Sequence, residues 1–168
     1  MIRLAVEKDL DEIVRIYNQA IPGRMATGDQ NPVSVESRRE WYLEHSENRH
    51  PIWIAEDKGK LVGWLSLSHF LRRASWELTA EVSIYVDFNY HHQGVGSELL
   101  QTALGRSHSL GLHALVSLVF RHNEPSLSFF SKFGFKEWGL LPETTELDNI
   151  KRDVLILGRL TPNTIKIS

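Results

Sequence analysis

The strongest constraint on the fold is a strand, a glycine-containing turn, a helix and a second strand that follow one another directly. Apolar and polar residues alternate over 78–86, which is typical of a strand with one buried face. A helical pattern then runs to near Gly111, which we expect to cap the helix in the left-handed conformation. The run at 115–120 is almost continuously apolar, as in a strand buried on both faces. Two strands joined through a helix tend to pair in parallel, so this segment predicts an α/β fold.

The flanking segments extend this unit to a mixed α/β sheet with helices around it. Apolar residues at helical spacing follow Asp9, Ser34 and Asn123, each of which is a good N-cap, and they predict three further helices. A turn with Gly59 joins two apolar runs, which indicates a hairpin. The remaining strands are expected at 2–5, 52–55, 61–65, 135–141 and 154–157.

The composition fits one domain and excludes several classes of function. The chain has 168 residues, 42% apolar and 24% charged, which suits a single domain over 1–160 with a polar tail at 161–168. The net charge of -2 is spread over interspersed residues, so we expect neither nucleic acid nor a membrane as partner. There is no cysteine, hence no disulfide and no thiolate nucleophile. With no targeting or membrane-spanning pattern, we expect a cytoplasmic protein that binds small molecules.

The turn at 91–97 is predicted to bind a pyrophosphate. Gly94 and Gly96 lie where the strand bends into the helix, and without a Cβ they let the backbone approach a ligand closely. The first N–H groups of the helix have no partner within it, so together with the helix dipole they attract an anion. A Gly-x-Gly alone is also compatible with a mere tight turn, and it matches neither the dinucleotide fingerprint nor the phosphate loop.

Four segments in the same order resemble the GNAT superfamily of acetyl-CoA-dependent N-acetyltransferases. They are Ala-Glu-Val-Ser-Ile-Tyr-Val at 80–86, Gln-Gly-Val-Gly-Ser at 93–97, Asn-Glu-Pro-Ser at 123–126 and Phe-Ser-Lys-Phe-Gly-Phe at 130–135. The chain is most similar to the phosphinothricin acetyltransferase branch, and the resemblance extends over 2–160. It implies a central twisted sheet that splays open between its fourth and fifth strands, with acetyl-CoA in the cleft.

The resemblance also assigns the contacts with acetyl-CoA. The backbone of Ile84, Tyr85 and Val86 is expected to pair with the pantetheine arm like an added strand. The backbone N–H groups of six residues are expected to bind the pyrophosphate: His92, Gln93, Gly94, Val95, Gly96 and Ser97. Asn123 is expected near the pantetheine, although it is also a good helix cap. Lys132 is expected near the distal end, although it could be an ordinary solvated lysine.

Two residues depart from the pattern of the family. His91 stands where the family usually has Gln or Arg, so anion binding would depend more on backbone donors. Phe130 stands where many relatives carry a Tyr that is proposed to protonate the leaving thiolate, and phenylalanine has no proton to give. The general acid is therefore open between Tyr85, water and no dedicated acid.

Glu81 is the candidate catalytic residue. An amine must lose a proton before it attacks a thioester, which calls for a general base. Glu81 stands at the position of the proposed catalytic Glu of the relatives, and burial would raise its pKa. Alternatively, backbone donors hold this carboxylate, or it binds the substrate ammonium without taking its proton. A main-chain N–H within 82–86 would stabilise the oxyanion.

The loop before this strand resembles the segment that meets substrate in the phosphinothricin branch. Arg72 or Arg73 could bind a carboxylate and Trp76 could form an apolar wall, unless these charges simply face solvent. With Glu81, they predict a small amino-acid-like amine of the phosphinothricin or methionine sulfone/sulfoximine type as substrate. A polyamine, a protein N-terminus and a non-catalytic acyl-CoA sensor are the alternatives.

We do not expect a metal site, but we do expect the protein to form a homodimer. The eight histidines form no His-x-x-x-His pair, and the chemistry of the family needs no metal. The family tends to pair through its C-terminal strands, which implies a homodimer.

Overall fold

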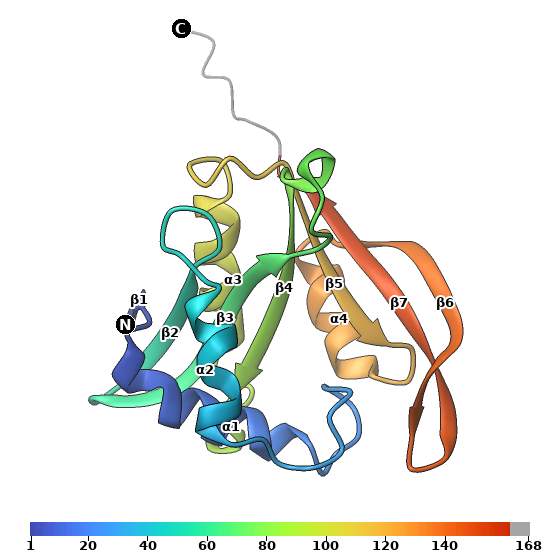
Figure 1. The fold of residues 1–168 in the computed structure, drawn as a ribbon, viewed down its shortest axis with the longest axis horizontal. Coiled ribbons are helices and arrows are strands. Elements are labelled where there is room, and N and C mark those ends of the chain that lie inside the picture. Colours follow the sequence, from blue (N-terminus) through green and yellow to red (C-terminus); the bar gives the residue numbers. More distant parts are fainter. Residues whose placement is uncertain (162–168) are drawn as a thin grey trace, which may run out of the picture.

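Seven strands form one sheet in the order β1-β2-β3-β4-β5-β7-β6, in a computed structural model that describes residues 1–161 (Figure 1). The strands are β1 (Ile2–Leu4), β2 (Ile52–Asp57), β3 (Lys60–His69), β4 (Thr79–Val86), β5 (Ala114–Phe120), β6 (Lys136–Leu147) and β7 (Ile150–Leu160). The helices are α1 (Leu10–Ala20), α2 (Val35–Leu43), α3 (Val95–Arg106) and α4 (Glu124–Lys132), with short 3-10 turns η1 (Glu7–Asp9), η2 (Ala74–Trp76) and η3 (Phe88–Tyr90). Strands β4 and β5 pair in parallel, whereas the other neighbours within 1–161 are antiparallel, which confirms the mixed α/β fold.

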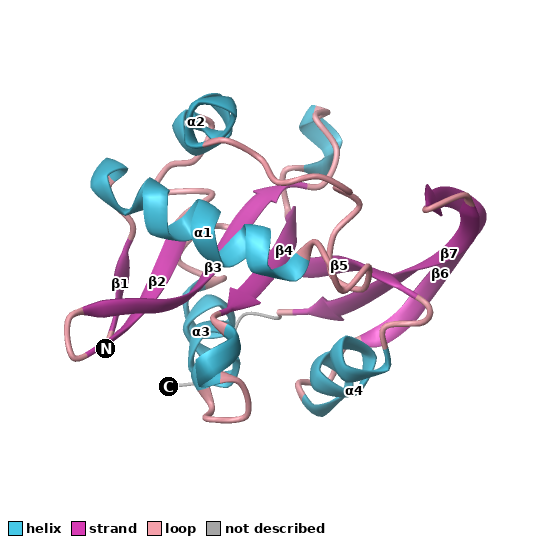
Figure 2. Ribbon diagram, turned by 90° about the horizontal axis from the view of Figure 1, so that it is seen from below, coloured by secondary structure: helices cyan, strands magenta, loops and turns pink. Residues whose placement is uncertain are grey.

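Helices cover both faces of the sheet, which explains the apolar strands. Figure 2 shows α1 and α2 on one face of β1 to β4 and α3 on the other, with α4 beside β5 and β7 on the side of α3. Apolar residues at helical spacing bury Ile13 and Ile16 of α1 against Ile54 and Trp64. On the opposite face, Leu99 and its neighbours in α3 fill the main core.

The sheet splays open between β4 and β5, as expected. The two strands pair only at Thr79↔Ala114, Ala80↔Leu115 and Glu81↔Val116. Beyond these pairs each strand is paired only on its outer side. Strand β4 remains paired with β3 as far as Val86, and β5 remains paired with β7 as far as Phe120. The inner edges of β4 and β5 are thereby left facing each other across a cleft.

The third helix ends earlier than the sequence predicts. It stops at Arg106, and Gly111 instead ends a following turn with φ 70°. The reason is local: Ser107 Oγ donates to the carbonyl of Ala103, and the N–H of Leu112 donates to Ser107, so the chain turns before it reaches the glycine. The left-handed glycine was correct, but its place at the end of the helix was wrong.

The C-terminal hairpin is longer than predicted. Strands β6 and β7 meet at Asp148 and Asn149, both with positive φ, as a tight two-residue hairpin turn requires. Two irregularities in the register of β6 interrupt the alternation that identifies a strand. Of the expected tail at 161–168, Thr161 is buried and bonded to the backbone of His113, and 162–168 lie outside the described residues.

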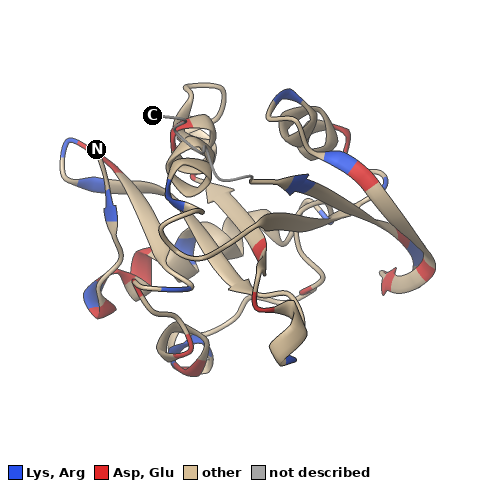
Figure 3. Cartoon of the chain, turned by 90° about the horizontal axis from the view of Figure 1, so that it is seen from above, with Lys and Arg blue, Asp and Glu red and all other residues tan. Residues whose placement is uncertain are grey.

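Charged residues of both signs are distributed along the chain. Figure 3 shows Lys and Arg interspersed with Asp and Glu along the chain. Among the helices of residues 1–161, none is both long and apolar enough to cross a membrane.

Candidate functional site

The open edge of β4 presents main-chain groups to the cleft. The N–H of Asp87 donates to the carbonyl of Val62 at 2.9 Å, which sets the alternation of hydrogen-bonded pairs between β3 and β4. Tyr85 therefore pairs with β3, whereas Val82, Ile84 and Val86 direct their N–H and C=O groups at the splay. Two of these carbonyls have partners: Ser117 Oγ donates to that of Val82 at 3.1 Å and the His91 ring to that of Val86 at 2.9 Å. The main chain of Ile84 faces the open cleft.

The glycine turn closes one end of this cleft. Gly94 has φ 86° and is the N-cap of α3, a left-handed conformation that favours glycine, and His92 also has positive φ. The N–H groups at the start of α3 point out of the helix, because the first turn has no internal acceptors for them. The imidazole of His91 lines the cleft but donates to the carbonyl of Val86 at 2.9 Å, so binding of an anion at the start of α3 would depend mainly on backbone donors and the helix dipole.

A cleft of about 690 Å³ joins the edge of β4 to the glycine turn. The predicted cofactor residues that line it are Ile84, Tyr85, Val86, His92, Gly94, Val95, Gly96, Ser97 and Lys132. Gln93 lies in the turn but uses its side chain to donate to the carbonyl of Asn89. The cleft is also lined by residues that sequence reasoning missed, namely Phe129 on α4 and Met25 and Ala26 in the loop after α1. No short motif marks that loop, which is held by hydrogen bonds of Arg24 with Asp148 and of Met25 with Asn123.

The side chain of Asn123 makes one of the contacts that hold the loop after α1. Its side chain is buried, with Oδ1 accepting from the N–H of Ser126 at 3.2 Å and Nδ2 donating to the carbonyl of Met25 at 2.9 Å. It therefore caps α4 and holds the loop over the cleft at the same time. Its direct contact with pantetheine stays a prediction.

Glu81 lies on β4 at the last pair before the splay. Its carboxylate is half-buried, and burial raises its pKa above the ordinary value. Within residues 1–161 no hydrogen bond or ion pair satisfies this carboxylate, so backbone donors do not hold it. A partly desolvated carboxylate without a partner can accept a proton from a ligand.

Ser68 lies opposite Glu81 and is contacted by His45, and sequence reasoning missed both residues. Ser68 is opposite Glu81 in the β3–β4 register. The ring of His45 contacts the Trp41 carbonyl through Nδ1 at 2.6 Å and Ser68 Oγ through Nε2 at 3.1 Å. A carbonyl can only accept, so Nδ1 carries the proton and Ser68 donates to Nε2. Burial lowers the pKa of His45, which keeps the ring neutral.

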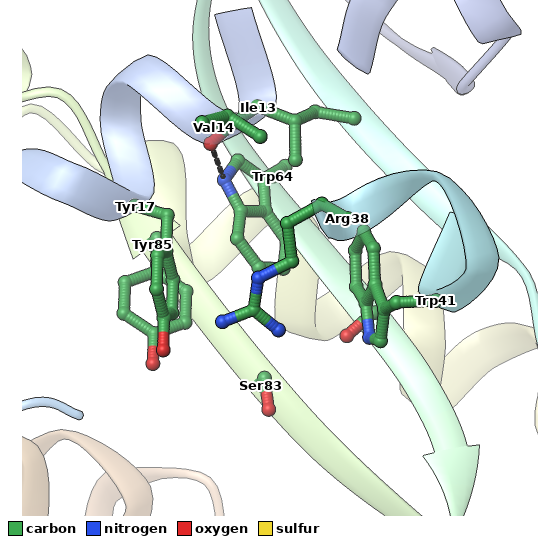
Figure 4. Close-up of a pocket in the computed structure, with 9 residues that line it drawn as sticks. Ile13, Val14, Tyr17, Arg38, Trp41, Trp64, Ser83 and Tyr85 are labelled. Atoms are coloured by element: carbon green, nitrogen blue, oxygen red, sulfur yellow. Dashed lines mark hydrogen bonds between the residues drawn. The ribbon is translucent and has the colours of Figure 1, made fainter. Parts of the chain in front are cut away.

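An aromatic pocket of about 140 Å³ lies on the α1 and α2 side of the sheet, against β3 and β4 (Figure 4). Ser83 lines it, two residues after Glu81 and on the same face of β4. Trp64 and Tyr85 stack at 4.8 Å, and Trp64 Nε1 donates to the carbonyl of Ile13 at 3.1 Å. The other lining residues are Val14, Tyr17, Arg38, Trp41 and Ser66.

The predicted substrate loop lies apart from both cavities. Arg72 is mostly exposed and pairs with Glu44 at 2.6 Å, and Arg73 is exposed. Trp76 is 40% exposed and packs edge-on against Phe70. None of the three lines the cleft or the aromatic pocket, and their contact with substrate stays a prediction.

Across residues 1–161, no cluster of three or more His, Cys, Asp or Glu side chains is arranged to hold a metal ion.

Comparison with known proteins confirms the resemblance seen in the sequence. The sequence model of the Acetyltransferase (GNAT) family matches residues 10–135. YwnH of Bacillus subtilis is 46% identical over 94% of this chain and 97% of its own length. The L-methionine sulfoximine/L-methionine sulfone acetyltransferase of Pseudomonas aeruginosa is 30% identical over 84% of this chain and 83% of its own.

A solved structure extends the likeness to the fold. The GNAT superfamily phosphinothricin acetyltransferase from Sinorhizobium meliloti, in complex with AcCoA, superposes with a TM-score of 0.89 at 25% identity. The alignment covers 95% of this chain and 87% of that one. The splayed sheet, the glycine turn and the sequence similarity agree, and this chain belongs to the acetyltransferase (GNAT) family.

Proposed function

We propose that this enzyme transfers the acetyl group of acetyl-CoA to the primary amine of a small amino-acid-like acceptor of the phosphinothricin or methionine sulfone/sulfoximine type. The observation that carries the proposal is the position of Glu81, an unsatisfied half-buried carboxylate at the last β4–β5 pair before the splay and two residues from Ser83 of the aromatic pocket. The acceptor class is supported by the activities that the names of the relatives give, and by a pocket that admits only a small molecule.

The cleft suits an elongated molecule with a pyrophosphate in its middle. The pantetheine arm pairs with the main chain of Ile84 and Val86, beside Tyr85, and satisfies groups that the splay leaves open. The pyrophosphate binds the backbone N–H groups of 92–97, where no Cβ projects from Gly94 or Gly96. Lys132 lines the same cleft and contributes a positive charge to the phosphates.

Glu81 accepts the proton of the acceptor ammonium, directly or through one water. The amine nitrogen then attacks the thioester carbonyl, the N–C bond forms and the C–S bond breaks. A main-chain N–H of β4 beyond Val82 stabilises the negative charge on the carbonyl oxygen, because these groups already point at the splay. The nitrogen gives up its second proton to water as the amide forms, and the departing thiolate takes a proton from the solvent or from an acid in the cleft.

The structure bears on the choice of acid. Phe130 is buried in the wall of the cleft and has no proton to donate. Tyr85 is kept protonated because burial raises its pKa, but its hydroxyl donates to the carbonyl of Ala26 at 2.9 Å. We propose that water protonates the thiolate and that no side chain is dedicated to this step.

A thiol-release assay tests the proposal. Purified protein is given acetyl-CoA and a panel that contains phosphinothricin, methionine sulfone, a polyamine and a short peptide. We expect turnover of the amino-acid analogues and a loss of about a hundredfold in kcat for Glu81→Gln, the usual size of a general-base contribution. Glu77→Gln changes an exposed carboxylate nearby and is the matched control, with unchanged turnover. Binding of acetyl-CoA without turnover of any amine would support a sensor instead.

We also propose that two copies associate through the C-terminal hairpin. Strand β6 lies at the edge of the sheet and exposes Trp138, Leu140 and Leu141, an apolar surface that a second copy could cover.

Dependence on acetyl-CoA favours a cytoplasmic location.

A further inference from the structure

Arg38 projects into the aromatic pocket from α2. Its guanidinium carbon lies 4.5 Å from the centre of the Tyr17 ring, and its side chain is 26% exposed. Figure 4 shows the guanidinium between Trp41 on one side and Tyr17 and Tyr85 on the other, directed toward Ser83. Arg38 and Trp41 are one helical turn apart, so α2 presents both to the same pocket. A cation is thus held where the walls are mainly aromatic.

Most of the hydrogen-bonding capacity of Arg38 is left for a ligand. Nη2 donates to Asp29 Oδ2 at 2.8 Å, and this is the single hydrogen bond of the guanidinium among residues 1–161. A guanidinium has a planar fork of N–H donors that binds two oxygens of one anion. Asp29 is itself held by the hydroxyl of Tyr17. The Asp29 carboxylate therefore fixes the orientation of Arg38 and leaves its other donors free.

The spacing of Glu81 and Ser83 along β4 indicates which part of a ligand would reach Arg38, because the guanidinium is directed toward Ser83 (Figure 4). Glu81 and Ser83 are two residues apart on one face of β4, a separation of about 6.7 Å along the strand. In an amino acid whose amine lies at Glu81, the α-carboxylate is too close to the nitrogen to span this distance. A group at the end of a short side chain can span it.

We propose that Arg38 is a specificity-determining residue that binds an anionic group, a phosphinate or carboxylate, at the end of the acceptor side chain. This inference rests on the proposed acetyl transfer and adds the charge of the acceptor to it. The aromatic rings of Tyr17 and Trp41 flank the ion pair and reduce its screening by water. The predicted role of Arg72 and Arg73 in binding an anion is not needed for this selectivity.

Two acceptors of nearly equal shape isolate the effect of charge. Phosphinothricin ends in a methylphosphinate, which is anionic, and methionine sulfone ends in a methylsulfone, which is neutral. We expect the wild type to have the higher kcat/KM for phosphinothricin. Arg38→Met should lower the ratio of the two kcat/KM values at least about tenfold, the weight of one charge-assisted hydrogen bond pair, mainly through the KM of phosphinothricin. Arg38→Lys should retain part of the ratio.

Arg39→Met is the matched control. Arg39 is on the same helix but pairs with Glu7 and Glu36 on the surface, so its loss should leave the ratio unchanged. The KM for acetyl-CoA and a thermal melt report whether each variant is folded. If the wild type acetylates both compounds and Arg38→Met keeps its preference, the role of Arg38 is wrong and the acetyl transfer stands. If the wild type acetylates neither of them nor any other amine, the proposed function itself fails.

Discussion

Asp87 connects the fold to the cofactor turn, and its replacement should disturb both. Its side chain has 0% exposure and accepts from Arg15 Nη1 at 2.8 Å and from the N–H of Asn89 at 3.0 Å, with Lys60 Nζ at 3.9 Å. These contacts tie α1 to η3, the turn that leads from β4 to the glycine turn. Asp87→Asn keeps the shape and an acceptor for Asn89 but removes the charge that Arg15 and Lys60 face.

The size of the effect follows from the burial of the two partners. Removing one member of a buried ion pair costs about 3–5 kcal/mol, because the other charge is left without compensation. Arg15 retains 34% of its side-chain exposure and can be partly solvated, so we expect a loss of about 2 kcal/mol. For a chain of this size that corresponds to a fall of about 4–8 °C in Tm. We also expect a higher KM for acetyl-CoA, since η3 positions the turn.

The pH dependence gives this prediction a second readout. Burial raises the pKa of Asp87, but the Asn89 N–H and the Arg15 guanidinium lower it by more, so the net pKa lies below the ordinary value. A lowered carboxyl pKa contributes stability above the unfolded pKa, and this is lost as pH falls through the folded pKa. Denaturant unfolding of wild type and Asp87→Asn should therefore differ at neutral pH, and the difference should shrink as the pH falls below the ordinary carboxyl range and through the lowered pKa of Asp87.

An exposed carboxylate is the control for Asp87. Glu36 is 84% exposed and lies 3.5 Å from Arg39, so Glu36→Gln should change the free energy of unfolding by less than about 0.5 kcal/mol. Equal stability of Asp87→Asn and wild type at neutral pH, or a difference that persists undiminished in acid, would refute the reasoning.

Three further predictions concern single residues. Gly63→Ala places a Cβ 2.9 Å from Val95 Cγ1 and 3.2 Å from the Tyr85 carbonyl, so the Val95 side chain at the start of α3 must shift; calorimetry should show a loss of about 1–3 kcal/mol and kinetics a higher KM for acetyl-CoA. Asn123→Ala removes the cap of α4 and the bond to Met25, and denaturant unfolding should show a loss of about 1 kcal/mol or more. Glu81→Gln should raise Tm at neutral pH, because a raised carboxyl pKa means that ionisation above it weakens the fold; an unchanged or lower Tm would count against the burial of this charge.

The parts of the fold that could be predicted depend on local signals. The alternation in β4, the glycines of the turn and the apolar run of β5 each act within a few residues, and they were sufficient to predict the parallel strand-helix-strand unit, whereas the splay was implied only by the family resemblance. Even local signals were imperfect. Asp9 does precede α1, but its side chain accepts from the N–H of Val6 and pairs with Arg3 in place of capping α1.

The aromatic pocket shows why the rest could not be predicted. Tyr17, Arg38, Trp64 and Ser83 come from four different elements, and only the packing of α1 and α2 on the sheet brings them together. In the sequence, Arg38 is one of several charges on an amphipathic helix and carries no sign of a special role. His45 and Ser68 are likewise joined only by tertiary contact.

The central claim is that Glu81 is the general base of an acetyl transfer, and the pH dependence of kcat/KM tests it most directly. Burial raises the pKa of Glu81 above 4.5, and the base must be ionised, so wild-type kcat/KM should fall as pH drops through that raised pKa. In Glu81→Gln the rate should be about a hundredfold lower and this acid limb should disappear. An equally steep acid limb in Glu81→Gln, or turnover equal to that of the wild type, would contradict the account.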